Sequence, residues 1–279
     1  MNKKLIAAAV ASVIAGGPAA ISVANADVGV YGTVHLRASL QDSKLGLGAG
    51  SQTRFGFKSS TDMGNGNTVS GVIEVGFDSS NGTVSTGSTG RLSNISYSGD
   101  WGSLTIGSQW SVMGTAQGKT CPNIGQACGG SVNYQSRVAD AIVLKTTVGG
   151  LDLNGQVELD GSDDLAGWAL STGIDVGSIS IGVGHRDYNT GDVNTVGVGT
   201  TIAGIGLGGS VSSNSANEDG WALTANISGL SLTIDENASD DQQVTANYNV
   251  DLGGSSMKFG VIDGDGASAK VVVQWSYGL

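Results

Sequence analysis

The C-terminal stretch Ala269-Lys-Val-Val-Val-Gln-Trp-Ser-Tyr-Gly-Leu279 carries the pattern that decides the fold. Every second residue from Val271 to Leu279 is apolar or aromatic, and the intervening positions hold Lys270, Gln274 and Ser276. Because successive side chains of a β-strand point to opposite faces, this alternation predicts a strand with one apolar and one polar face.

The same alternation recurs along almost the whole chain. It defines segments that begin near residues 28, 51, 68, 91, 103, 139, 151, 167, 178, 193, 205, 220, 230, 242, 256 and 269. We therefore expect 16 strands, with 14 as the alternative, since glycine-rich segments can shift their pairing register.

The connections between these segments alternate in length. Nearly minimal turns are expected at Gly149-Gly150, Gly177, Gly204 and Gly229, whereas residues 41–50, 79–90, 112–138, 160–166 and 214–219 form longer links. Short turns at one end and longer loops at the other are typical of transmembrane barrels. The predicted fold is all-β: an antiparallel up-and-down β-barrel that spans a membrane.

The composition limits the alternatives. Of 279 residues, 47 are glycine and only two are proline, which favours continuous strand pairing over helices or a proline-containing β-sandwich. The net charge of −11 disfavours a nucleic-acid partner, because phosphate contacts need a basic face. No cofactor motif is present, and Asp263-Gly-Asp-Gly lacks the later glutamate of a calcium loop, so we expect neither cofactor nor metal.

The N-terminus predicts export. Two lysines precede an apolar run, and the segment ends in Val-Ala-Asn-Ala at Ala26, which is the pattern of a signal peptide over residues 1–26. Residues 27–279 then form a single barrel domain. Disulfides persist outside the cytoplasm, and the short span closed by Cys121 and Cys128 permits the approach a disulfide needs. We therefore expect these two cysteines to be joined.

Several segments resemble the general diffusion porins of Gram-negative bacteria. The resemblance is carried by Val28-Gly-Val-Tyr-Gly-Thr, by residues 51–66, 91–110 and 134–144, and by the alternating C-terminal strand. It implies a trimer in the outer membrane, in contact with lipid and lipopolysaccharide, that passes ions and small hydrophilic solutes. It also implies that a constriction loop at about residues 111–138, the third long connection, folds into the lumen.

The alternation assigns charged residues to the polar face, because an unpaired charge facing lipid near the membrane midplane costs about 2–4 kcal/mol. His35, Arg37, Arg54 and Lys58 share this inward parity, and Arg91 has the parity of Ile95 and Tyr97, which predicts a rim position. The expected pore-lining and constriction residues are Arg37, Arg54, Lys58, Glu74, Lys119 and Arg137.

The sequence departs from the family pattern at three points. The chain ends in Leu279 where the family ends in phenylalanine, and Ser108 follows Gly107 where the family has arginine. Residues 112–138 contain no carboxylate, whereas the family's third loop carries acids that face the basic wall. We therefore expect a net positive constriction.

Two other classes of protein fit the sequence less well than a passive channel. An enzyme needs a base near a nucleophile or a water, and the two histidines, His35 and His185, lie on distant strands. The alternative to a porin is a glycine-rich secreted or surface β-structural protein such as an adhesin. The family-like segments and the C-terminal strand favour the porin.

Overall fold

The computed structural model describes residues 27–48, 53–84, 91–117, 136–161, 164–189, 191–216, 218–237 and 239–279. Residues 1–26, the predicted signal peptide, lie outside these ranges. The first half of the chain contributes β1 (Asp27–Gln41), β2 (Lys44–Gly48), β3 (Thr53–Asp62), β4 (Thr68–Asp78), β5 (Thr83–Val84), β6 (Leu92–Gly99), β7 (Gly102–Trp110), the helix α2 (Met113–Gln117), β8 (Arg137–Val148) and β9 (Leu151–Leu159). The second half contributes β10 (Leu165–Val176), β11 (Ile179–Tyr188), β12 (Gly191–Ile202), β13 (Ile205–Asn214), β14 (Asp219–Ile227), β15 (Leu230–Glu236), β16 (Gln242–Asp251), β17 (Ser255–Gly264) and β18 (Ala267–Gly278).

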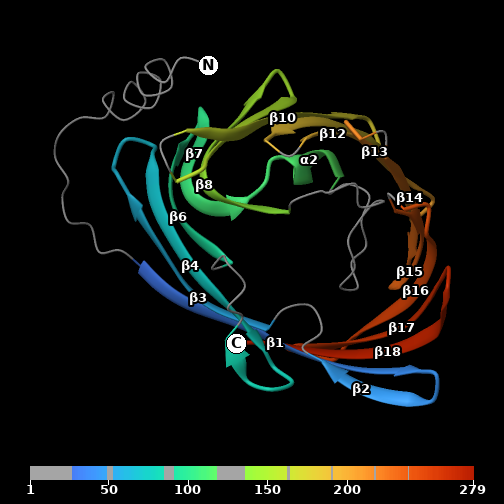
Figure 1. The fold of residues 1–279 in the computed structure, drawn as a ribbon. Coiled ribbons are helices and arrows are strands. Elements are labelled where there is room, and N and C mark those ends of the chain that lie inside the picture. Colours follow the sequence, from blue (N-terminus) through green and yellow to red (C-terminus); the bar gives the residue numbers. More distant parts are fainter. Residues whose placement is uncertain are drawn as a thin grey trace.

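These strands form one antiparallel sheet that closes on itself (Figure 1). The closing pair is β1 with β18, in register from Thr33 opposite Gly278 to Leu40 opposite Val271. Both β2 and β3 pair with β1, and both β5 and β6 pair with β4, so each couple forms one strand of the wall. The described residues thus make a 16-stranded barrel, which confirms the predicted number and excludes 14.

One of the predicted long loops is a hairpin instead. The chain reverses after β1 in a turn at Asp42 and Ser43, and β2 then pairs back onto β1 with Lys44 opposite Gln41. Both turn residues have positive φ, 50° and 60°, which is the backbone of a tight hairpin turn that matches the twist of paired strands. The expectation of a loop over residues 41–50 was therefore wrong, because the tight turn lets the strands extend.

The two faces of the wall have the opposite polarity to a water-soluble β-sandwich. Large apolar side chains on alternate positions are exposed on the outside, for example Val30, Ile73, Ile95 and Leu170. Most inward positions are polar, as at Gln274, which is only 1% exposed. A continuous apolar outer face suits contact with lipid, and a closed barrel leaves no unpaired strand edge inside the membrane.

The helix content is small. The described residues contain no helix long and apolar enough to cross a bilayer. The short helix α2 lies inside the ring of strands in Figure 1.

Candidate functional site

The lumen is the only face on which polar side chains gather systematically in the described strands. Arg37 on β1 lies opposite Gln274 on β18, and Gln274 lies opposite Lys258 on β17, so these side chains share one inward row. Arg54 on β3 is opposite Thr33 and Lys58 is opposite Gly29, on the same face. The structure therefore places these basic residues on one arc of the wall, formed by β17, β18, β1 and β3, spread along β1 from the level of Arg37 to the level of Gly29.

Glu74 is a carboxylate on β4, the strand that continues this arc beyond β3. It is 4% exposed and points inward from β4. Arg91 Nε donates a hydrogen bond to Glu74 Oε1, and Arg54 Nε lies 3.4 Å from Glu74 Oε2. One negative charge is thus shared by two arginines, and this group of three residues keeps a net positive charge.

The position of Arg91 corrects the sequence-based expectation of a rim site. Arg91 is buried inside the barrel against Glu74. It precedes Leu92, the first residue of β6, where the fourth strand of the wall is interrupted between β5 and β6. The alternation of β6 does not extend across that interruption, so parity could not place this side chain. Arg91 is therefore a lumenal residue that the sequence analysis missed.

Two further basic residues belong to the wall. Arg137 is the first residue of β8, where it pairs with Trp110. His35 faces the lumen from β1, with its Nδ1 2.8 Å from Ser276 Oγ. The remaining predicted residues, Lys119, Cys121 and Cys128, lie outside the described ranges.

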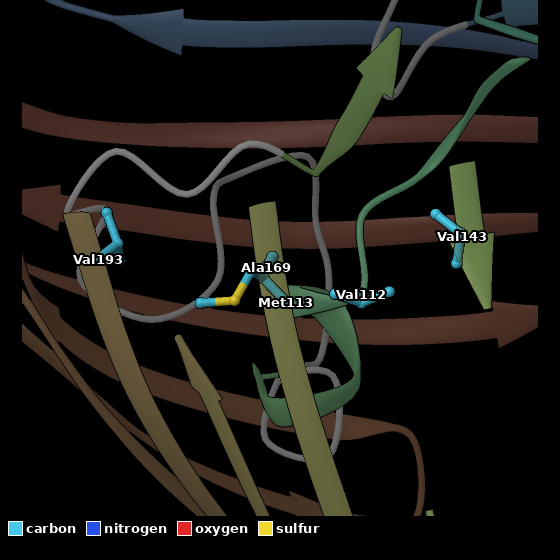
Figure 2. Close-up of a cluster of buried hydrophobic side chains, with 5 residues drawn as sticks. All are labelled: Val112, Met113, Val143, Ala169 and Val193. Atoms are coloured by element: carbon cyan, nitrogen blue, oxygen red, sulfur yellow. The ribbon is translucent and has the colours of Figure 1, made fainter. Parts of the chain in front are cut away.

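The third connection enters the barrel at its start. After β7, Ser111 and Val112 lead into α2, which packs against β10, β11 and β12. Val112 and Met113 are 0% and 1% exposed and form a cluster with Val143, Ala169 and Val193 from the wall (Figure 2). The inward path predicted for this loop is confirmed for residues 111–117.

A second ion pair lies beside this cluster. Arg186 on β11 donates from Nε to Glu158 Oε1 and from Nη2 to Glu158 Oε2, each at 3.0 Å. The guanidinium also lies over the Tyr188 ring, 4.6 Å from its centroid. Both partners are almost completely buried, so their charges neutralise each other within the wall.

The wall formed by β12, β13 and β14 differs from the basic arc. Apart from Val193, Asn214 and Asn226, its described inward positions carry small or hydroxyl side chains, and none is charged; examples are Thr195, Gly197, Ser210, Ala222 and Thr224. The lumen is therefore asymmetric, with positive charge gathered on one arc. No group of three or more metal-ligating side chains occurs in the part of the chain that the structure describes.

Known proteins resemble the chain in sequence pattern and in fold. The sequence model of the family described as Gram-negative porin matches residues 7–279. A comparison with curated protein sequences found no match.

Three solved structures illustrate the likeness of fold. The anion-selective porin from Comamonas acidovorans is 16% identical with a TM-score of 0.71, and 91% of this chain covers 100% of that one. A triple mutant of the porin from Rhodopseudomonas blastica is 12% identical with a TM-score of 0.73 over 91% and 100% of the two chains. The trimer form of in-vitro folded OmpT, an outer membrane protein of Vibrio cholerae, is 11% identical with a TM-score of 0.66 over 91% and 99%.

Proposed function

The chain belongs to the Gram-negative porin family, and we propose that the charged arc inside its barrel controls which solutes cross its pore. The protein is an outer-membrane diffusion porin. A barrel of 16 strands is wide enough to leave an aqueous channel, through which ions and small hydrophilic solutes can diffuse. The observation that carries this function is the reversed polarity of the wall, apolar outside and polar inside.

The proposed pore-lining residues are Arg37, Arg54, Lys58, Glu74 and Arg137, together with Arg91 from the structure and Lys119 from the loop. Support for Arg37, Arg54, Lys58 and Glu74 comes from their inward register, and support for Arg91 comes from its hydrogen bond to Glu74. The constriction is proposed to lie where residues 111–138 cross the lumen, since the first residues of that loop already leave the wall.

We propose a weak preference for anions. The positive charges on the arc outnumber Glu74, and residues 112–138 carry no carboxylate to balance them. Low-dielectric walls close to a narrow lumen focus this field on a passing ion. The acidic residues of the long connections act in the opposite sense at the mouth, where salt screens them within about 10 Å at 0.1 M.

The assembly is proposed to be a homotrimer held in outer-membrane lipid and lipopolysaccharide. The trimer form of the Vibrio cholerae protein, which has a similar fold, supports this proposal. Detergent-extracted protein should migrate as an oligomer that heating dissociates, and migration as a monomer before heating would contradict the trimer. Residues 1–26 are proposed to be removed on export, which leaves Asp27 as the N-terminus.

The family consists of channel proteins, and we propose that this member has no catalytic activity. His35 faces the lumen, whereas His185 lies on the outer face with its ring 5.1 Å from that of Trp168. The two histidines therefore cannot act on one substrate.

Liposome swelling tests the diffusion function. Liposomes that contain the refolded protein should swell in small sugars, and more slowly as the sugar grows. Swelling no faster than in empty liposomes, with the protein shown to be inserted, would contradict the proposal.

A further inference from the structure

We propose that Gln156 and Ser171 are positioning residues that latch the start of the lumenal loop to the barrel wall. This inference rests on the proposed pore, because the loop they hold is the one that narrows it. The two side chains come from neighbouring strands, β9 and β10, and both face inward. Each makes a hydrogen bond to the backbone of Val112, the residue at which the loop has left β7.

The two hydrogen bonds satisfy both backbone groups of Val112. Its N–H donates to Gln156 Oε1 at 3.0 Å, and its carbonyl accepts from Ser171 Oγ at 2.8 Å. Val112 is 0% exposed, so water cannot replace these partners. Because a buried backbone group without a partner is costly, the two side chains fix where the chain enters the lumen.

Gln156 is itself held in place by the buried ion pair. Its Nε2 donates to Glu158 Oε1 at 2.8 Å, and Arg186 donates a hydrogen bond to each oxygen of that carboxylate. The chain of contacts therefore runs from Arg186 through Glu158 and Gln156 to the loop backbone. In this proposal the Arg186–Glu158 ion pair holds Gln156 in position and is not part of the route that permeating ions take.

An apolar seat lies beside the latch. Val143, Ala169 and Val193 occupy inward positions, most of which are polar on the rest of the described wall, and they form one buried cluster with Val112 and Met113. Gly184 keeps the space open, since a Cβ there would lie 3.0 Å from Met113 Sδ. The hydrogen bonds from Gln156 and Ser171 fix the direction in which the chain leaves the wall. The apolar contacts with Val143, Ala169 and Val193 hold α2 against the wall.

Single-channel recording tests the latch. In the double variant Gln156→Leu with Ser171→Ala, both polar partners of Val112 are lost. The population of channels with a displaced loop should rise by about tenfold or more, because the lost hydrogen bonds no longer favour the seated state. The recording should then show loss of the single conductance level and greater open-channel noise.

Matched variants separate the loss of loop positioning from the general effect of removing polar groups from the inner wall. Asn247→Leu with Thr245→Ala removes similar inward polar groups from β16, on a strand that does not seat α2, and should keep a single conductance level. Ser171→Thr keeps the hydroxyl group and should behave like the unmodified protein. Heat-modifiable electrophoresis shows whether each variant is a folded barrel.

The outcomes are distinguishable. A folded double variant with an unchanged conductance level and unchanged noise would overturn the latch. If the double variant does not fold, the conductance level and open-channel noise of Ser171→Ala are compared with those of Ser171→Thr. Equal values in these two variants would overturn the latch. An unmodified protein that inserts and does not conduct would instead overturn the proposed function, whatever the variants do.

Discussion

Glu74 and Arg91 form a buried ion pair inside the barrel, although Arg91 stands outside the regular alternation of β6. Arg54 shares the same carboxylate from the opposite neighbouring strand. This arrangement leaves the lumenal wall with more positive than negative charge where β3, β4 and β6 meet.

Arg54→Glu should shift the reversal potential toward cations at every salt concentration, because it reverses a charge on the arc. Reversal potentials in planar bilayers under a salt gradient measure the effect. Lys44→Glu makes the same change of charge on the β1–β2 hairpin, and its effect should fade at high salt, where screening is strongest. Strong cation selectivity of the unmodified protein at high salt, insensitive to Arg54→Glu, would show that the loop does not place the constriction at the arc.

Glu74→Gln should strengthen anion preference and weaken the barrel. The change removes the negative charge that Arg54 and Arg91 share and leaves Arg91 buried without its counter-charge. The loss of stability should be roughly 3 kcal/mol, as for other broken buried pairs, and should lower the temperature of the heat-induced gel shift. Asp152→Asn is the matched control, since it removes one inward carboxylate whose partner, Thr147, is exposed. An equal loss of stability in Glu74→Gln and Asp152→Asn would argue against a special role for Glu74.

Gly184→Val should disturb the seated loop, because its side chain would meet Met113 and Thr195. Open-channel noise should increase, as for loss of the latch. Gly206→Val on β13 is the control, since a Cβ there makes only ordinary contacts with Asn226. Equal noise in the two variants would mean that Met113 is not held by this contact.

Cys121 and Cys128 should form a disulfide within the third loop. Intact-mass analysis of the purified protein should show a gain of two hydrogens after reduction, and no cysteine should react with an alkylating agent beforehand. The bond would stiffen the loop, whereas the barrel is held by its closed sheet. Two reactive thiols in the unreduced protein would contradict this prediction.

Much of the fold could be predicted because alternation is a local property. Each strand buries or exposes every second side chain, so the pattern in residues such as Val271 and Lys270 is enough to assign faces. The 16 strands and the inward parity of Arg37 and Arg54 came from this pattern alone. The hairpin at Asp42 and Ser43 was missed because its second strand, Lys44–Gly48, is only five residues long and shows just two alternating apolar residues, Leu45 and Leu47.

The contacts of the site depend on pairing between strands, which a sequence pattern does not contain. Arg91 meets Glu74 through the register of β4 and β6, and Val112, which follows β7, meets Gln156 on β9, two strands further along the wall. One signal was available. Val143, Ala169 and Val193 break the polar inward pattern, and an apolar group on a water-facing wall indicates that something covers it.

The central claim is that water fills the barrel and ions diffuse through it. Single-channel recording of the purified protein in planar bilayers tests this most directly. The account predicts stepwise insertions, each with a conductance that is linear in voltage and rises with salt concentration. Protein that is folded and inserted, as shown by its heat-modifiable migration, yet produces no conductance steps would contradict it.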